Sequence, residues 1–547
     1  MTEFMDQETR EHLAWDYAWN LFQPLSELGR IWQSQVRPFR PSEKEKWQED
    51  CRCITNLQTA LQDVEWAERL QKTVAAFRTI EPIFQQVDAG VVLQTGDLFK
   101  WKQWMWNGKL LDELVHIRFP WWPDVEWDTV IRILNSEADM TPKFSLDDSY
   151  DPVLQELRGR KRRLQNEIDR IRKEQQDELK SRYGRMPNRE REYIWSRDDR
   201  EMIERSQADQ DLMLQGETSW DVIFRVQDRA ETISLLDEFQ RAAEQEADRE
   251  KELLAKLTRL LAVHIDTFRK CEAAWGRLDW LLTRILTADR LGWKAPVWTE
   301  DRWEAVNACH PVLSAALKQK GSQITPISFR LQRGISVLTG PNMGGKTVAL
   351  RTAGLLQALA QYGMPVPAET FYFQPVDRIR FVGGDPQSME NGLSTFGGEI
   401  VRLSTILKAE GTVFLLLDEV GRATNPLEGE ALAVGLTRYL QRSDWIVLFA
   451  THYAGVAEVA AQEGLLRWRV AGLADRRIVS ADTARIELES LRIAELLGLR
   501  TEILSYSRQW LDTNHKHPGR KGDFDEQAEP GTGKNCSSAT IRSGDCR

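Results

Sequence analysis

A glycine-rich octapeptide in the C-terminal half of the chain constrains the fold more than any other feature. It fits the pattern G-x-x-x-x-G-K-T, and its members are Gly340, Pro341, Asn342, Met343, Gly344, Gly345, Lys346 and Thr347. A β-branched run, ISVLT (335–339), precedes it, and a helical pattern, TVALRTAGLLQALAQ, begins at its last residue. In this context the backbone N–H groups of the loop point at phosphate oxygens, and the helix N-terminus adds a favourable dipole. We expect Lys346 to neutralise the β- and γ-phosphates of ATP and Thr347 to ligate Mg²⁺.

An acidic pair closes a second apolar strand about seventy residues further along the chain. The run VFLLL (413–417) is apolar throughout, as in a buried central strand, and it leads directly into Asp418 and Glu419. Asp418 is placed to hold the Mg²⁺ shell. Glu419 is placed to polarise the attacking water, a general-base role that typically contributes about 10²–10⁴-fold. A third strand, WIVLF (445–449), precedes His452, which can sense the γ-phosphate as a hydrogen-bond donor. Together these motifs predict an ATP-binding and hydrolysis site.

Four runs of sequence resemble the MutS family, in the family's order and at similar spacing. They are TGPNMGGKTVALRTAGLL, GDPQSMENGLSTFGGE, LLLDEVGRATNPLEGEALA and FATHY. The resemblance covers about residues 300–510 and is closest to the shorter subfamily that lacks the mismatch-recognition domain. Residues 1–100 contain no Phe-x-Glu, the motif that forms the family's mismatch wedge.

The resemblance implies an ABC-type ATPase that works as a dimer with two composite ATP sites. The dimer partner would be a second copy of the chain or a related MutS-like subunit. Ser394 stands where a helix is expected to begin, and a serine there is a common helix cap. In this family the same serine acts in trans on the γ-phosphate bound by the opposite subunit. The resemblance also assigns the octapeptide to phosphate binding, and Asp418, Glu419 and His452 to the metal, the water and the γ-phosphate.

The residue pattern changes along the chain, which predicts a multidomain protein of the α and α/β classes. Residues 1–150 resemble an N-terminal helical core, and residues 151–290 resemble long charged lever or clamp helices joined by a short polar turn near Pro187. Over residues 291–512 strands alternate with helices, which predicts a C-terminal ABC-type P-loop ATPase with a mostly parallel sheet. Residues 513–547 are polar and rich in Gly, Ser and Lys, so we expect a disordered tail.

Composition restricts the class of protein further. At 547 residues the chain is too long for one hydrophobic core, and its net charge of −10 argues against a surface that is basic throughout. It has neither an apolar run long enough to span a membrane nor an N-terminus typical of a secretory signal. We therefore expect a cytoplasmic protein that does not contact membranes. Six cysteines lack the paired spacing of a zinc site and are expected to be free thiols: Cys51, Cys53, Cys271, Cys309, Cys536 and Cys546.

A local basic cluster is the best candidate surface for nucleic acid. Between residues 158 and 200 there are 15 basic and 9 acidic residues. At the tip of two arms such a cluster would contact phosphates without reading sequence. The alternative, which stays open, is an exposed helix pair whose charges pair with each other. The candidate DNA-contacting residues are Arg158, Arg160, Lys161, Arg162 and Arg163.

Three functions are compatible with these patterns. The first is a DNA-associated clamp ATPase, related to mismatch repair, whose nucleotide-driven closure locks the arms around double-stranded or branched DNA. The second uses the same motor to remodel a protein client, such as a cobalamin-dependent aminomutase that requires reactivation. The third, action on stalled ribosomes, is less favoured because no nuclease-like domain follows the ATPase motifs in this sequence. The first is our main prediction and the second its alternative.

Overall fold

The C-terminal half of the chain is built on a mostly parallel six-stranded sheet with the order β13-β12-β7-β11-β10-β9. All neighbouring strands run parallel except β13, which pairs antiparallel with β12. Parallel strands whose two faces are both covered read as continuous apolar runs, which is why the sequence motifs predicted them. The strands are β7 (Gly334–Thr339), β9 (Arg378–Gly383), β10 (Val413–Asp418), β11 (Ile446–Ala450), β12 (Leu466–Val470) and β13 (Ile478–Ser480).

Helices cover both faces of this sheet. Phe414 and Leu416 of β10 face a core that contains α14 (Lys346–Gln361), whereas Leu415 and Leu417 face the opposite core. That second core is formed with α15 (Thr395–Leu407), α16 (Pro426–Leu440) and α17 (Ala454–Gln462). The predicted mostly parallel sheet of the C-terminal half, with helices on both faces, is therefore confirmed.

A second, four-stranded sheet packs beside α14 in the order β4-β8-β5-β6. Its strands are β4 (Val297–Trp298), β5 (Trp303–Ala308), β6 (Ile327–Leu331) and β8 (Thr370–Phe373), and α13 (Pro311–Gln319) connects β5 to β6. Helix α19 (Thr501–His515) follows later in the chain. The Nε1 of Trp303 in β5 donates to Gln357 of α14 at 2.9 Å, and this buried hydrogen bond joins the four-stranded sheet to the helix.

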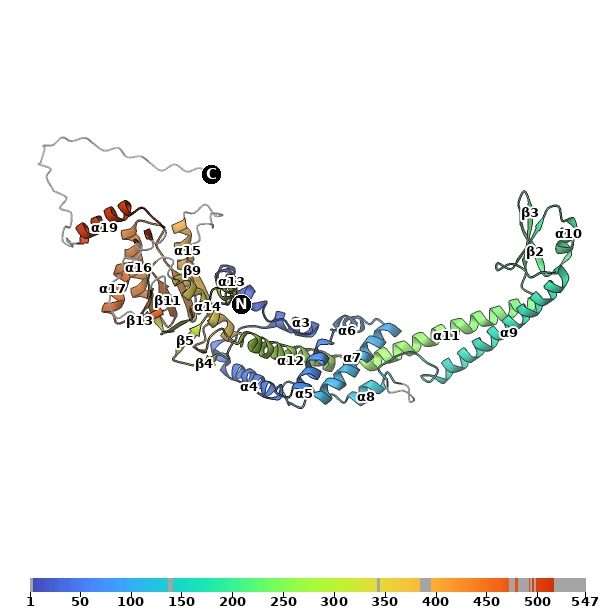
Figure 1. Ribbon diagram of the computed structural model, residues 1–547. Coiled ribbons are helices and arrows are strands. Elements are labelled where there is room, and N and C mark those ends of the chain that lie inside the picture. Colours follow the sequence, from blue (N-terminus) through green and yellow to red (C-terminus); the bar gives the residue numbers. More distant parts are fainter. Residues whose placement is uncertain are drawn as a thin grey trace, which may run out of the picture.

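The first residues of the chain pack against the six-stranded sheet, and Trp19 and Phe22 also contact Trp280 of the N-terminal helical core. Met5 pairs with Ile379 of β9, and Leu13 and Phe22 belong to the same core as α14. The segment contains α1 (Gln7–His12) and α2 (Trp15–Trp19). The N-terminus therefore extends the edge of the sheet at β9 (Figure 1).

The N-terminal helical core is arranged around the long helix α12 (Ile265–Leu291). Buried Trp101, Trp275 and Phe268 pack together with the surrounding helices. The helices are α3 (Glu27–Gln35), the short η1 (Pro41–Glu43), α4 (Lys44–Ala60), α5 (Val64–Ala75), α6 (Glu81–Asp88), α7 (Thr95–Leu114) and α8 (Trp127–Arg132). This confirms the predicted helical core, with α12 as a member that comes late in the sequence.

A two-helix arm extends from this core, and it ends in a small folded tip. The arm pairs α9 (Pro152–Tyr183) with α11 (Ala230–Ala262), and Gly184, at φ +72°, ends α9. The tip contains β1 (Glu192–Ser196), α10 (Arg200–Ala208), β2 (Leu212–Glu217) and β3 (Asp221–Val226) around their own small core. The predicted lever helices are confirmed, but the short polar turn between them was wrong. The buried alternation of Tyr193, Trp195, Val222 and Phe224 builds an antiparallel sheet there.

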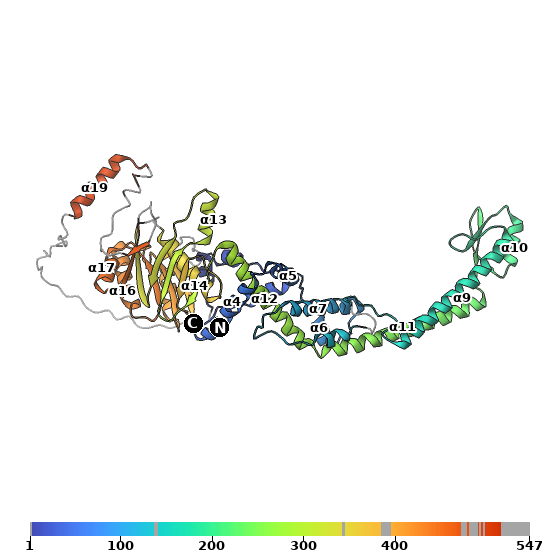
Figure 2. The ribbon, with the colours of Figure 1, turned by 60° about the horizontal axis from the view of Figure 1, so that its bottom comes forward.

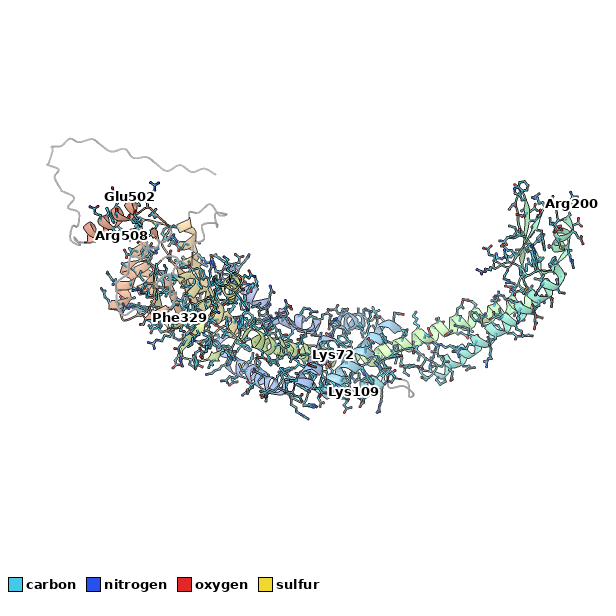
Figure 3. All side chains as sticks on the ribbon, in the orientation of Figure 1. Lys72, Lys109, Arg200, Phe329, Glu502 and Arg508 are labelled. Atoms are coloured by element: carbon cyan, nitrogen blue, oxygen red, sulfur yellow. The ribbon has the colours of Figure 1, made fainter. Side chains whose placement is uncertain are left out.

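The molecule is elongated, with the ATPase sheets at one end and the tip at the other (Figures 1 and 2). Figure 3 marks these ends with Phe329 and Arg200, and the helical core between them with Lys72 and Lys109. Cys51, Cys53, Cys271 and Cys309 are free thiols. Among the residues described, no helix has the length and apolar character needed to cross a membrane. This computed structural model describes residues 3–135, 141–341, 345–383, 395–471, 478–480, 491, 494–495 and 498–515.

Close packing between α12 and α3 depends on a glycine, and its substitution is the first prediction. A Cβ at Gly276 would lie 2.7 Å from the carbonyl oxygen of Leu28. Because backbone must shift to relieve that overlap, Gly276→Ala should destabilise the protein by about 1–3 kcal/mol and lower its Tm. Gly159 of α9 is the matched control, since a Cβ there meets nothing within 4 Å. Gly159→Ala should leave Tm equal or higher when unfolding is followed by circular dichroism. Equal Tm values for both variants would contradict the packing argument.

Candidate functional site

The glycine-rich loop lies between β7 and α14, as the octapeptide predicted. Gly340 has φ +146° and Gly345 has φ +109°, conformations that favour glycine. Gly345 is the N-cap of α14, and none of the described side chains caps the first amides of this helix. A Cβ at Gly345 would meet nothing within 4 Å. Open space before uncapped amides fits a phosphate group. Asn342, Met343 and Gly344 lie outside the described residues.

Lys346, the first residue of α14, is buried and folds back over the loop. Its Nζ donates to the carbonyl oxygens of Gly340 at 2.9 Å and Pro341 at 3.2 Å. The same Nζ lies 3.1 Å from Oε1 of Glu419. The ammonium group therefore lies between the glycine-rich loop and the acidic pair that the sequence predicted.

Thr347, in the first turn of α14, contacts Asp418 at the end of β10. The hydroxyl of Thr347 donates to Oδ2 of Asp418 at 2.7 Å. Burial raises the pKa of Asp418, and the hydrogen bond from Thr347 opposes this rise. Hard divalent cations such as Mg²⁺ prefer oxygen ligands of these two kinds. The hydroxyl and the carboxylate therefore fit the first ligands of a magnesium ion.

Glu419 follows β10 with its carboxylate surrounded by cationic or hydrogen-bonding groups. Its Oε1 lies 3.6 Å from Nδ1 of His452, and its Oε2 accepts from Nη1 of Arg422 at 3.2 Å. Interaction with His452, together with the ammonium of Lys346, lowers the pKa of Glu419 to about 2 against the opposing effect of burial. The side chain is therefore ionised at neutral pH and can accept a hydrogen bond from water.

Strand register brings these groups together at the carboxyl ends of the parallel strands. Asp418 pairs with Ala450 of β11, and Ala450 pairs with Leu338 of β7, so the three strands end at the same level. His452 follows β11 with its side chain 39% exposed. The structure thus brings together five of the predicted site residues: Lys346, Thr347, Asp418, Glu419 and His452. The predicted in-trans residue, Ser394, lies outside the described residues.

The sequence reasoning missed two residues that hold the loop after Glu419. The N–H of Gly421 donates to Oε2 of Glu399 at 3.2 Å, and the carbonyl oxygen of Gly421 accepts from Oη of Tyr453 at 2.9 Å. Burial raises the pKa of Glu399. Both residues lie inside runs that carried the family resemblance, but no spacing rule connects residue 399 with residue 421. Only the fold shows this contact.

The basic cluster on α9 lies in the half of the arm nearer the helical core. Arg158, with Lys161, contacts Glu246 of α11, and Arg158 also donates to Glu250 at 2.6 Å. The other three candidates are exposed; Arg160 is 3.4 Å from Glu238 and Arg162 is 3.6 Å from Asp148. Arg163, the fifth predicted DNA contact, is also exposed.

The expected position at the tip was wrong for the five candidates between residues 158 and 163, although the basic segment 158–200 continues into the tip through β1. About twenty residues of α9, or roughly 30 Å of helix, separate the cluster from the tip. Three of the five basic side chains pair with carboxylates on α11, so their positive charge is partly neutralised within the arm.

Comparison with known proteins places the site in a recognised domain. Residues 336–479 match MutS domain V. A DNA mismatch repair protein MutS from Granulibacter bethesdensis is 34% identical over 231 residues, which cover 41% of this chain and 25% of that protein. An Endonuclease MutS2 from Pelotomaculum thermopropionicum is 33% identical over 276 residues, covering 48% of this chain and 34% of the relative.

A longer match extends beyond the ATPase domain. An Endonuclease MutS2 from Staphylococcus epidermidis is 24% identical over 395 residues, which cover 70% of this chain and 50% of that protein. The chain thus spans between a quarter and a half of the length of these curated relatives. The predicted resemblance to the MutS family is confirmed, most specifically over its domain V.

Removal of the Lys346 ammonium tests the nucleotide-binding loop. We predict that Lys346→Ala weakens binding of a fluorescent ATP analogue by at least about tenfold, because a buried charge-assisted contact to phosphate is lost. Lys318→Ala is the control, since that residue lies on α13 outside the loop. Fluorescence titration should show wild-type affinity for the control. Unchanged affinity of Lys346→Ala would exclude the phosphate-binding assignment.

Proposed function

From the premise that this chain carries MutS domain V, an ABC-type ATPase domain, we propose that it is a nucleotide-driven dimeric clamp that acts on DNA. The observation that carries the proposal is the convergence of Lys346, Thr347, Asp418, Glu419 and His452 at one edge of the parallel sheet. Two relatives that match the domain are named for DNA mismatch repair and for an endonuclease, which favours DNA as the client.

Each site residue has a distinct role in the proposed hydrolysis of ATP. Lys346 would leave Glu419 to neutralise the β- and γ-phosphates, while Thr347 and Asp418 hold Mg²⁺, which supplies charge neutralisation there. Departure of that ammonium removes one of the causes of the low pKa of Glu419. The carboxylate would then be a stronger acceptor for the proton of the attacking water. His452, already beside Glu419, would donate to the γ-phosphate.

The composite site would be completed by a second copy of the chain. We propose that Ser394 of one subunit acts on the γ-phosphate bound by the other, so that closure depends on nucleotide. A related MutS-like subunit with the same serine would serve equally. The dimer thereby converts ATP binding into a change in the separation of two arms.

A chain of buried contacts offers a route from the nucleotide to the arm. Helix α14 starts at Lys346, and Gly363 follows its far end. There Nη1 of Arg284 on α12 donates to the carbonyl oxygen of Gly363 at 2.9 Å and to Oδ2 of Asp50 at 2.5 Å. Arg284 is 2% exposed, so its displacement would leave a buried charge unpaired. Because α12 leads back to α11, we propose that movement of α14 is passed to the arm through Arg284.

The charge of the tip favours a second candidate, a protein client. Residues 184–226 contain ten acidic and seven basic residues, which is unfavourable for a surface that contacts DNA phosphates. The tip also exposes apolar side chains, including Trp220 at 80%, Ile194 at 42% and Met213 at 49%. Exposed apolar groups of this kind are typical of protein contacts. The same motor would then remodel a protein, such as a cobalamin-dependent aminomutase.

Glu419→Gln tests the proposed chemistry. The variant should bind ATP with Mg²⁺ but reduce kcat by roughly 10²–10⁴-fold, because the amide does not accept the proton of the attacking water. It should also hold the dimer closed with ATP, as measured by light scattering after gel filtration. Glu428→Gln, in the first turn of α16, is the matched control and should hydrolyse ATP at the wild-type rate. Full turnover by Glu419→Gln would remove Glu419 from its proposed role.

DNA titration at several salt concentrations separates the two clients. For a DNA clamp, the logarithm of the affinity should fall linearly with the logarithm of salt concentration, because phosphate contacts release counterions. Replacing exposed Arg162 and Arg163 together by Ala should reduce the slope by up to about two. Replacing Arg69, an exposed residue of α5, by Ala should leave the slope unchanged. Absence of binding to duplex and branched DNA, with ATPase activity intact, would reject DNA in favour of a protein client.

A further inference from the structure

Glu419 has a backbone conformation that residues with a Cβ rarely adopt. Its φ is +54°, in the left-handed region. Such a conformation persists only where the surrounding structure fixes it, and it is often found at functional sites. On one side, the N–H of Glu419 donates to the carbonyl oxygen of Ala450 at 2.9 Å. The other side of the turn must also be held if the carboxylate is to keep its direction.

Gly421 holds the other side of the turn, because both its N–H and its carbonyl oxygen form hydrogen bonds with side chains. Oε2 of Glu399, on α15, accepts from its N–H at 3.2 Å, and Oη of Tyr453 donates to its carbonyl oxygen at 2.9 Å. Gly421 also has a positive φ of +85°. Behind it lies α16, where a Cβ at Gly429 would be 2.4 Å from the carbonyl oxygen of Gly421. The loop is therefore enclosed, and its position is determined by two side chains from different elements.

We propose that Glu399 and Tyr453 are positioning residues for hydrolysis, which hold Gly421 so that the carboxylate of Glu419 points at the attacking water. Neither residue needs to touch the nucleotide to have this effect. Both act through one glycine two residues beyond the general base. The inference rests on the role proposed above for Glu419.

The two side chains suit this task for different reasons. Glu399 is half-buried, and the N–H of Gly421 partly compensates the cost of burying its carboxyl group. Tyr453 is 7% exposed, and its ring lies beside His452 with centroids 4.5 Å apart. The hydroxyl of Tyr453 therefore ties the strand end that carries His452 to the loop that follows Glu419. Loss of either contact would allow the turn to relax toward commoner φ values.

Steady-state ATPase kinetics test the proposal. Because a small misplacement of a reacting group can cost about a hundredfold, Glu399→Ala should reduce kcat by roughly ten- to a hundredfold. Its KM for ATP and its affinity for a fluorescent ATP analogue should stay within about twofold of wild type, because the phosphate-binding residues are untouched. Glu399→Gln keeps a carbonyl oxygen for the N–H of Gly421 and should restore kcat to within about threefold. A general loss of folding would instead lower affinity and Tm together.

Two further variants keep the test decisive if Glu399→Ala does not fold. Tyr453→Phe keeps the ring and removes only the donor to Gly421, so kcat should fall roughly three- to tenfold at unchanged affinity. Glu410→Ala, an exposed residue beyond the far end of α15, is the control and should match wild type. Wild-type kcat in both Glu399→Ala and Tyr453→Phe would overturn the proposal. Equal loss of kcat in Glu399→Gln and Glu399→Ala would exclude the hydrogen-bond acceptor as the reason.

Measuring Glu419→Gln in parallel distinguishes failure of the positioning role from failure of the general-base role proposed for Glu419. If Glu419→Gln turns over ATP at the wild-type rate, the proposed chemistry fails, whatever Glu399 does. If Glu419→Gln is slow while Glu399→Ala and Tyr453→Phe are unaffected, only the positioning role is wrong. Slow turnover in all three variants, with nucleotide affinity preserved, supports both.

Discussion

The burial of α14 is the constraint on which the rest of the structure depends. Thirteen of its sixteen residues are buried between the six-stranded sheet and the four-stranded sheet, so the helix cannot tilt without disturbing both. Its buried glutamines satisfy their amides: Gln361 donates to the carbonyl oxygens of Phe39 and Val376 at 2.9 and 2.8 Å. A helix fixed in this way keeps Lys346 at the glycine-rich loop and its other end against α12. The nucleotide site and the arm are thus connected by rigid elements.

Charge within the site is balanced by contacts that can be exchanged. Lys346 and Arg422 neutralise Glu419, and Thr347 donates to Asp418. Each of these contacts is with a group that the proposed reaction would engage elsewhere, with phosphate, metal or water. Gly421, in contrast, is held by groups that have no such competing partner in the proposal. The site therefore combines exchangeable charges with a backbone frame that stays in place.

The same pairing of charges has a different effect in the arm. Long cationic side chains on α9 meet carboxylates on α11, as Arg158 does with Glu246, and Arg172 with Asp228 in the loop before α11. Residues 158–200 have 15 basic and 9 acidic residues, but the acids that pair with Arg158 and Arg172 lie 88 and 56 residues later in the chain than those arginines. A cluster that appears strongly basic along the sequence is therefore partly neutralised once the two helices pair. The candidate DNA contacts lie away from the tip because they are in the first half of α9.

The sequence by itself determined which strand ends bring Lys346, Thr347, Asp418, Glu419 and His452 together. Strands buried on both faces are apolar throughout, and loop glycines followed by Lys346 and Thr347 are required by phosphate geometry, so local pattern was sufficient. It also predicted the helical core and the long arm helices. Tertiary structure alone decided which residues distant in sequence meet: Glu399 with Gly421, Arg284 with Gly363, and Met5 with Ile379. The folded tip was missed because its strands, EYIWS, LMLQGE and DVIFRV, contain charged and polar residues and are not continuous apolar runs like the strands of the six-stranded sheet. Such contacts depend on how elements pack, and no local rule of spacing encodes that packing.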